Sequence, residues 1–149
     1  MNDLRELYQQ VIVDHNRSPR NFGEMHDCTS HVEGFNPLCG DHLTVYLHIN
    51  NGNVEKVSFT GQGCAISTAS ASIMTETLQG KTVKEAEQLF QTFHELMTAK
   101  SPDTDMSQLG KLSVLAGVRE YPSRIKCATL AWHAIHEALT GEGEVVSTE

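Results

Sequence analysis

The chain has 149 residues, of which 19 are acidic and 11 are basic, so its formal net charge is −8 at pH 7. This length predicts a single domain over residues 1–149 that buries its core without disulfide bonds. Nucleic acid is not an expected partner, because phosphate contacts need clustered Lys and Arg side chains, which this sequence lacks. We find no apolar run of about eighteen residues and no signal-peptide pattern, and therefore expect a cytoplasmic protein without a membrane partner.

Apolar side chains recur at helical spacing at the start of the chain: Leu4, Leu7, Val11 and Ile12. They predict an amphipathic helix that ends near Arg17, followed by an irregular segment. Residues 28–35 alternate weakly between apolar and polar side chains and are assigned as a strand. Cys28 in this strand is expected to pack as a small apolar side chain.

A β-hairpin is the clearest strand signal. The apolar residues of its first arm alternate strictly with more polar ones: Leu43, Val45, Leu47 and Ile49. Turn residues follow at 50–53, and residues 54–60 form the second arm, with Val57 and Phe59 on one face. This pattern predicts an antiparallel pair with one buried side, which helices must cover.

Helical spacing replaces the alternation after Cys64, and Gly80 marks the expected end of that helix. Its apolar stripe consists of Ile66, Ala69 and Ile73. Thr82 and Glu85 form a capping box that opens the next helix. The apolar face of that helix carries Val83, Ala86, Leu89, Phe90, Phe93 and Met97.

The last third of the sequence contains two predicted breaks, at residues 101–103 and 117–122. A shorter apolar pattern through Leu109, Leu112 and Leu115 lies between them. The final helix is expected to start near Ser123 or Arg124 and to direct Ala128, Ala131, Trp132, Ile135 and Leu139 inward. Residues 142–149 are polar and are expected to form a frayed tail. The predicted fold is α+β, with about three antiparallel strands covered on one face by several helices.

Three cysteines stand where the backbone is expected to turn or a helix to begin: Cys39, Cys64 and Cys127. With Asp41 they offer four donors, which is the number that a tetrahedral zinc site or an iron–sulfur cluster requires. Cys39 and Asp41 are two residues apart, so their side chains can point the same way in an extended loop. Helix N-termini favour anionic side chains at Cys64 and Cys127.

Spacing alone does not show that these donors converge. Further candidate ligands are His42, His48, His133 and His136, which are expected to be solvated because they fall on the polar faces of the predicted strand and helix.

Three segments together resemble the IscU/NifU-N family of iron–sulfur cluster assembly proteins: NPLCGD at residues 36–41, GQGCAIS at 61–67 and RIKCA at 124–128. The similarity runs from Leu7 and the segment DHNRSPRN at 14–21 to the final helix. It implies an IscU/NifU-N-like fold and a place in iron–sulfur cluster biogenesis.

Three features resemble the SufU branch of this family more than its scaffold members. Lys126 stands where the scaffolds carry a histidine, their Leu-Pro-Pro-Val-Lys motif is absent, and residues 90–116 are similar to the SufU insertion. This resemblance implies a zinc-dependent sulfurtransferase with metal ligands Cys39, Asp41, Cys64 and Cys127. It further implies that Cys39 accepts persulfide sulfur and that Arg124 engages a pyridoxal-phosphate cysteine desulfurase of the SufS type.

Two alternatives remain open from the sequence. The same four donors could assemble a [2Fe–2S] cluster on a non-catalytic scaffold that passes it to downstream iron–sulfur assembly proteins, so enzymatic activity is not decided. A purely structural zinc site would make folding depend on the metal. The clear core pattern argues against that last reading.

Overall fold

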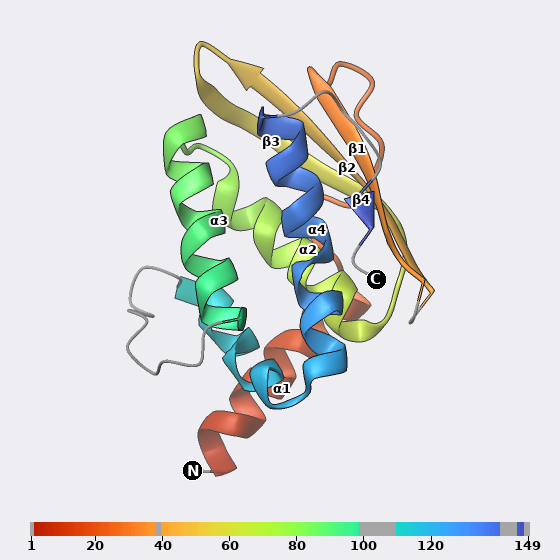
Figure 1. The fold of residues 1–149 in the computed structure, drawn as a ribbon, viewed down its shortest axis with the longest axis vertical. Coiled ribbons are helices and arrows are strands. Elements are labelled where there is room, and N and C mark those ends of the chain that lie inside the picture. The colour runs from red at the N-terminus through yellow and green to blue at the C-terminus, as the bar shows by residue number, and fades with distance from the viewer. Residues whose placement is uncertain (1, 38–39, 99–109, 141–145, 148–149) are drawn as a thin grey trace.

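The structure, a computed structural model, describes residues 2–37, 40–98, 110–140 and 146–147. Its elements in chain order are α1 (Asn2–Arg17), β1 (Ser30–Asn36), β2 (Asp41–Asn50), β3 (Asn53–Gln62), α2 (Ala65–Leu78), α3 (Val83–Thr98), the 3₁₀ helix η2 (Gly110–Glu120), α4 (Pro122–Thr140) and β4 (Val146–Ser147). Figure 1 shows α2, α3 and α4 gathered on one side of the sheet. The predicted α+β fold is therefore confirmed.

The three predicted antiparallel strands form the sheet, in the order β3-β2-β1. Their register brings Asn36 opposite Asp41 and His42 opposite Gln62. The end of β1, the start of β2 and the end of β3 therefore meet at one end of the sheet. On β2 the predicted alternation holds, because Leu43, Val45 and Leu47 are buried while their neighbours are more exposed.

A fourth strand was not predicted. Val146 and Ser147 form β4, which pairs in parallel with Gly34 and Phe35 on the free edge of β1. This part of the expected frayed tail is thus a strand. Two residues are too few to show a periodic pattern, and the pairing stabilises them through backbone hydrogen bonds that any sequence can make.

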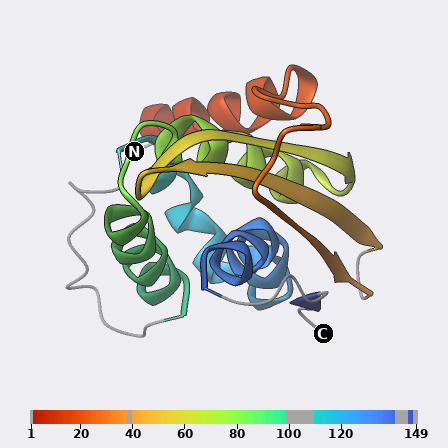
Figure 2. The same cartoon turned by 90° about the horizontal axis from the view of Figure 1, so that it is seen from above.

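Two helices, α2 and α4, pack directly on the sheet, and α1 and η2 pack against α2. Figure 2, a view from above, shows α1 beside α2, and α4 also packs against α2. The largest buried side chains of the core are Trp132, Phe59 and Phe93. None of the described helices is long and apolar enough to cross a membrane.

Helix α2 is buried on all sides rather than along the single predicted stripe. Its buried residues include Ser67, Ser70 and Ser72, whereas Ile66 is only partly buried. Small side chains allow close neighbours on every face. Ser70 donates a hydrogen bond to the carbonyl of Ala128 on α4 and accepts one from Trp132 Nε1.

The other predicted helix boundaries need one correction. The capping box is confirmed, because Glu85 accepts from the backbone of Thr82 and Thr82 Oγ1 accepts from the backbone of Glu85. The expected break at 117–122 is wrong: η2 continues to Glu120, and only Tyr121 separates it from α4. A 3₁₀ helix tolerates the glycine at 117, and proline is favourable at the first position of α4. The predicted break at 101–103 and Leu109 lie outside the described residues.

A buried polar contact joins α1 to α2. His15 is fully buried, and its Nδ1 lies 2.7 Å from Ser72 Oγ. Its Nε2 lies 3.5 Å from a carboxylate oxygen of Glu76. Because a buried imidazole requires hydrogen-bond partners, this contact fixes the end of α1 against α2.

Candidate metal centre

Three of the four predicted ligands converge in the structure. One ligand atom from each of Asp41, Cys64 and Cys127 lies within 4.8 Å of the others. In the described parts of the chain this is the sole group of three or more such side chains. Cys39, the fourth predicted ligand, lies outside the described residues. The convergence that sequence spacing left open is therefore present for three donors.

The sheet register positions the first two donors. Asp41 is the first residue of β2 and is buried, and β3 ends nearby at Gln62. Gly63 then leads directly into Cys64, the N-cap of α2. Asp41 Oδ1 accepts a hydrogen bond from the backbone N–H of Cys64 at 2.8 Å, and Oδ2 lies 4.0 Å from Cys64 Sγ.

Two glycines before Cys64 permit this close approach. Gly61 has a φ of +125°, and a Cβ there would lie 2.2 Å from the carbonyl oxygen of His42. A Cβ on Gly63 would lie 3.0 Å from Asp41 Oδ1 and 3.1 Å from Ser67 Oγ. Gly61 therefore needs to be glycine, as a tight strand-to-helix connection requires, whereas a side chain at position 63 would press on Asp41 and Ser67.

Cys64 begins α2 as predicted. Its Sγ accepts a hydrogen bond from the backbone N–H of Ser67 at 3.4 Å, so the sulfur takes the place of a capping oxygen. An N-cap side chain satisfies one of the free N–H groups of the first helical turn. The sulfur thus faces the positive end of the helix dipole, which favours an anionic ligand.

Cys127 differs from the prediction in its position along the helix. Because α4 begins at Pro122, Cys127 lies one turn inside the helix rather than at its N-terminus. Its side chain is fully buried, and Sγ lies 4.0 Å from the carbonyl oxygen of Ser123. Cys127 therefore lies beyond the free N–H groups of the helix end. Contacts from elsewhere in the fold must stabilise its sulfur as a metal ligand.

The donor set fits a tetrahedral metal ion. Zinc binds sulfur at about 2.3 Å and oxygen at about 2.0 Å, which places tetrahedral donors roughly 3.5–3.8 Å apart. The 4.0 Å between Asp41 Oδ2 and Cys64 Sγ is close to this separation. Two thiols and a carboxylate would hold zinc, and thiolates are also the usual ligands of iron–sulfur clusters.

Sequence reasoning missed two buried polar residues beside these donors. Asn36 is fully buried, and its Nδ2 donates to Cys127 Sγ at 3.7 Å. Ser67 is fully buried as well, and its Oγ has no hydrogen-bond partner among the described residues. The signal for both lay in the sequence, since each is a polar residue three positions from a predicted cysteine ligand.

The four candidate histidines lie elsewhere. His42 is exposed, with Nε2 3.8 Å from Glu33, and His48 Nδ1 lies 2.7 Å from the carbonyl oxygen of Asp27. The expectation that His133 and His136 are solvated is wrong, because both pack against Phe90. The ring of His136 stacks on Phe90 with centroids 4.5 Å apart, and the centroid of His133 is 5.6 Å away.

The packing around Phe90 affects the charge of His133. Burial lowers the pKa of His133 from its ordinary value of 6.5, and the neighbouring His94 and His136 lower it further. The ring centroids of His94 and His133 are 5.4 Å apart. None of these imidazoles joins the donor group formed by the described residues.

Two further residues singled out from the sequence, Arg124 and Cys28, lie outside the donor group. Arg124 is exposed in the first turn of α4, one turn before Cys127, and its backbone N–H donates to the carbonyl of Tyr121. Cys28 is half-buried just before β1 and is a free thiol.

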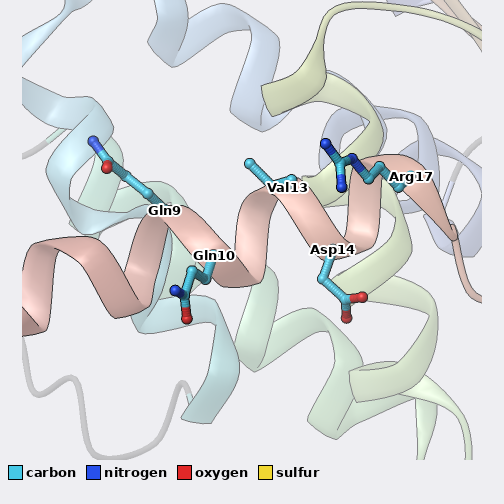
Figure 3. A pocket seen from close by; sticks show the side chains of 5 residues that line it. All are labelled: Gln9, Gln10, Val13, Asp14 and Arg17. Carbon is cyan, nitrogen blue, oxygen red and sulfur yellow. The ribbon is translucent and has the colours of Figure 1, made fainter.

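A surface hollow also lies on α1. Figure 3 shows its five lining side chains, all on one helix: Gln9, Gln10, Val13, Asp14 and Arg17. They include no thiol and only one carboxylate. The donor group at the end of the sheet is the better candidate on chemical grounds.

Comparison with known sequences supports this choice. The family profile described as "NifU-like N terminal domain" matches residues 7–128. The "Zinc-dependent sulfurtransferase SufU" of Bacillus subtilis is 41% identical over 140 residues, covering 94% of each chain. The "Iron-sulfur cluster assembly scaffold protein IscU" of Streptococcus pyogenes is 38% identical, covering 93% of this chain and 86% of its own.

Solved structures show the same fold. A putative iron–sulfur cluster assembly scaffold protein for the SUF system from Fervidobacterium islandicum superposes with a TM-score of 0.83 at 33% identity, covering 88% of this chain and 95% of its own. The N-terminal part of a NifU-like protein from Brucella abortus has a TM-score of 0.80 at 21% identity, covering 89% and 91%. At that lower identity the likeness concerns the fold alone.

Proposed function

Because the chain belongs to the family of NifU-like N-terminal domains, we propose that it acts in iron–sulfur cluster biogenesis as a zinc-dependent sulfurtransferase. In this proposal Cys39, Asp41, Cys64 and Cys127 hold the zinc ion. The observation that carries it is the convergence of Asp41, Cys64 and Cys127 within 4.8 Å. The similarity to a protein named zinc-dependent sulfurtransferase supports zinc over other metals.

Cys39 is the proposed sulfur acceptor. Two peptide units separate it from Asp41, so its α-carbon is at most about 7 Å from that of a residue in the donor group. Gly40, next to it, has a φ of +74°, a conformation that glycine adopts without strain. Of the cysteines in the proposed site, Cys64 caps a helix and Cys127 is buried within one, which leaves Cys39 as the one best suited to meet a partner.

The proposed reaction is a thiol–persulfide exchange. The Cys39 thiolate attacks the terminal sulfur of a persulfide on a cysteine of a SufS-type desulfurase. A bond forms between Cys39 and that terminal sulfur, the sulfur–sulfur bond of the desulfurase breaks, and its cysteine leaves as a thiolate with the electron pair. No oxidant or reductant is consumed. A bound zinc ion would keep cysteine sulfurs deprotonated before the transfer.

Arg124 is the proposed contact for the desulfurase. It is exposed one turn before Cys127, so a partner that reaches the donor group passes near it. A guanidinium can bind a carboxylate of the partner in a bidentate fashion. Downstream iron–sulfur assembly proteins would then receive the sulfur.

Persulfide transfer tests this function directly. The chain is incubated with a pyridoxal-phosphate cysteine desulfurase and cysteine, and persulfide is labelled and located by mass spectrometry. We expect Cys39→Ser to lose the label while Cys28→Ser, a change at a thiol outside the donor group, retains it. Equal labelling of Cys39→Ser and the unmodified chain would refute the assignment of Cys39.

The second candidate function is a scaffold that assembles a [2Fe–2S] cluster on the same four residues. The similarity to proteins named as IscU scaffolds favours it. Anaerobic purification separates the two functions. A colourless protein with one zinc ion per chain supports sulfur transfer, and visible absorption with bound iron and sulfide supports the scaffold.

A further inference from the structure

Asn36 makes two contacts that link separate parts of the donor group. Its side-chain Nδ2 donates to Cys127 Sγ at 3.7 Å. Its backbone carbonyl accepts from the N–H of Gly40 at 2.9 Å, which closes the turn between β1 and β2. Asp41 lies directly opposite Asn36 in the sheet register. One residue therefore contacts a buried cysteine of α4 and also bonds or pairs with Gly40 and Asp41 at the start of β2.

The burial of Asn36 calls for a specific reason. The side chain is fully buried, and a buried amide costs free energy unless it is hydrogen-bonded. An apolar residue would fill this position on the inner face of β1 at lower cost, because Val32 and Gly34 precede it on that face. The Cys127 sulfur accepts from this amide, and it would do so more strongly as a charged thiolate than as a neutral thiol.

We propose that Asn36 is a positioning residue for the metal centre, holding the Cys127 sulfur as a ligand by an N–H···S hydrogen bond. This inference rests on the proposed metal site. Cys127 lies one turn inside α4, beyond the first turn of the helix. Asn36 directs a side-chain N–H group at its sulfur, as the backbone N–H of Ser67 is directed at the sulfur of Cys64.

Charge explains why such a donor matters. In the proposed site, three thiolates and a carboxylate around one divalent cation leave two net negative charges. N–H groups directed at the sulfurs offset this charge, and removing a hydrogen bond to a metal ligand typically weakens metal binding by about 10- to 100-fold. The contact also keeps the sulfur in one orientation when other ligands change.

Cobalt binding without any desulfurase tests the proposal. Co²⁺ is titrated into metal-free protein, its sulfur-to-metal charge-transfer band is recorded, and zinc affinity is measured by competition with a chelator. We expect Asn36→Ala to weaken zinc binding at least tenfold and to move the band to longer wavelength, because a sulfur without its hydrogen bond gives up charge more easily. Unchanged affinity and an unchanged band would overturn the proposal.

A second variant separates hydrogen bonding from packing. Leucine has nearly the shape of asparagine but no donor, so Asn36→Leu retains the fold and should bind zinc as weakly as Asn36→Ala. Restoration of affinity and band by leucine would show a space-filling role and overturn the proposal. Thr75→Ala is the matched control, since Thr75 is a buried polar residue in the last turn of α2 that donates to Ser72 O. It should lower stability without moving the band.

The design distinguishes the two proposals. Cys64→Ser and Cys127→Ser test the site itself, and zinc binding that is unaffected by both would refute the proposed metal centre. If both serine variants lose zinc while Asn36→Ala and Asn36→Leu bind it normally, the metal centre stands and the role of Asn36 is refuted.

Discussion

The Asp41 carboxylate holds the first turn of α2 through Cys64. Its Oδ1 accepts the Cys64 backbone N–H at 2.8 Å, while Oδ2 lies 4.0 Å from the sulfur of the same residue. The Asp41 carboxylate is a proposed metal ligand, and it also orients the backbone of Cys64, a second proposed ligand. A substitution at Asp41 should therefore remove a metal ligand and also disturb the position of Cys64.

We expect Asp41→Ala to reduce zinc affinity by at least tenfold, because it removes a proposed ligand and the acceptor that positions Cys64. Chelator competition measures the affinity. Glu33→Ala is the control, since Glu33 is an exposed carboxylate on the neighbouring strand. Equal loss of affinity in both variants would mean that general charge, not ligation, is responsible.

Gly63→Ala should weaken metal binding without unfolding the protein. The new methyl group would lie 3.0 Å from Asp41 Oδ1 and 3.1 Å from Ser67 Oγ, so one of these groups must move. Zinc affinity and the thermal unfolding midpoint are measured together. At Gly117 nothing lies within 4 Å of the added methyl, so Gly117→Ala should leave the affinity unchanged.

Removal of the metal should lower the unfolding midpoint but leave the fold intact. The core around Trp132, Phe59 and Phe93 is formed by apolar packing between the sheet and the helices rather than by the donor group. A ligand that binds only the folded state stabilises it by mass action. Far-ultraviolet circular dichroism after chelation should retain its helical signal, and its collapse would indicate a structural zinc protein instead.

Stability should fall on acidification through the window set by His133. The unfolded chain binds the proton near the ordinary pKa of 6.5, whereas the folded protein binds it only at the lowered pKa. Between the two values the unfolded state carries more protons, so the free energy of unfolding decreases as the pH falls.

His133→Leu should flatten this pH dependence relative to the unmodified chain. Urea midpoints at pH 7.5 and 5.5 measure it, and comparison at equal pH removes the contribution of acid-labile metal ligands. The exposed His31 provides the control variant, His31→Leu. A flattening of the same size in the control would show that burial beside Phe90 is not the cause.

The sequence predicted those features that depend on local periodicity. The alternation of Leu43, Val45 and Leu47 and the capping box of Thr82 and Glu85 both appear as expected. The continuation of η2 through Gly117 was missed because glycine is a break signal only on average. The pairing of Val146 with Gly34 was missed because strands of two residues have no period.

The sequence predicted which residues belong to the candidate site, but not that they lie close together in the fold. The residue types of Asp41, Cys64 and Cys127 indicated a metal, yet their convergence depends on strand register and on the packing of α4, which sequence spacing does not encode. Asn36 was missed because a polar residue before a proline also suits an ordinary turn. The sequence does not show that His133 is partly buried, because Phe90, which packs against it, lies on another helix.

The hydrogen bond between Ser70 and the carbonyl of Ala128 joins α2 to α4 close to the two cysteines of these helices. Ser70 follows Cys64 by less than two helical turns, and Ala128 adjoins Cys127. The spacing of the two sulfurs is therefore set by interhelical packing before any ion arrives. In the proposed metal centre, residues that do not bind the ion would therefore help to set the distance between two of its ligands.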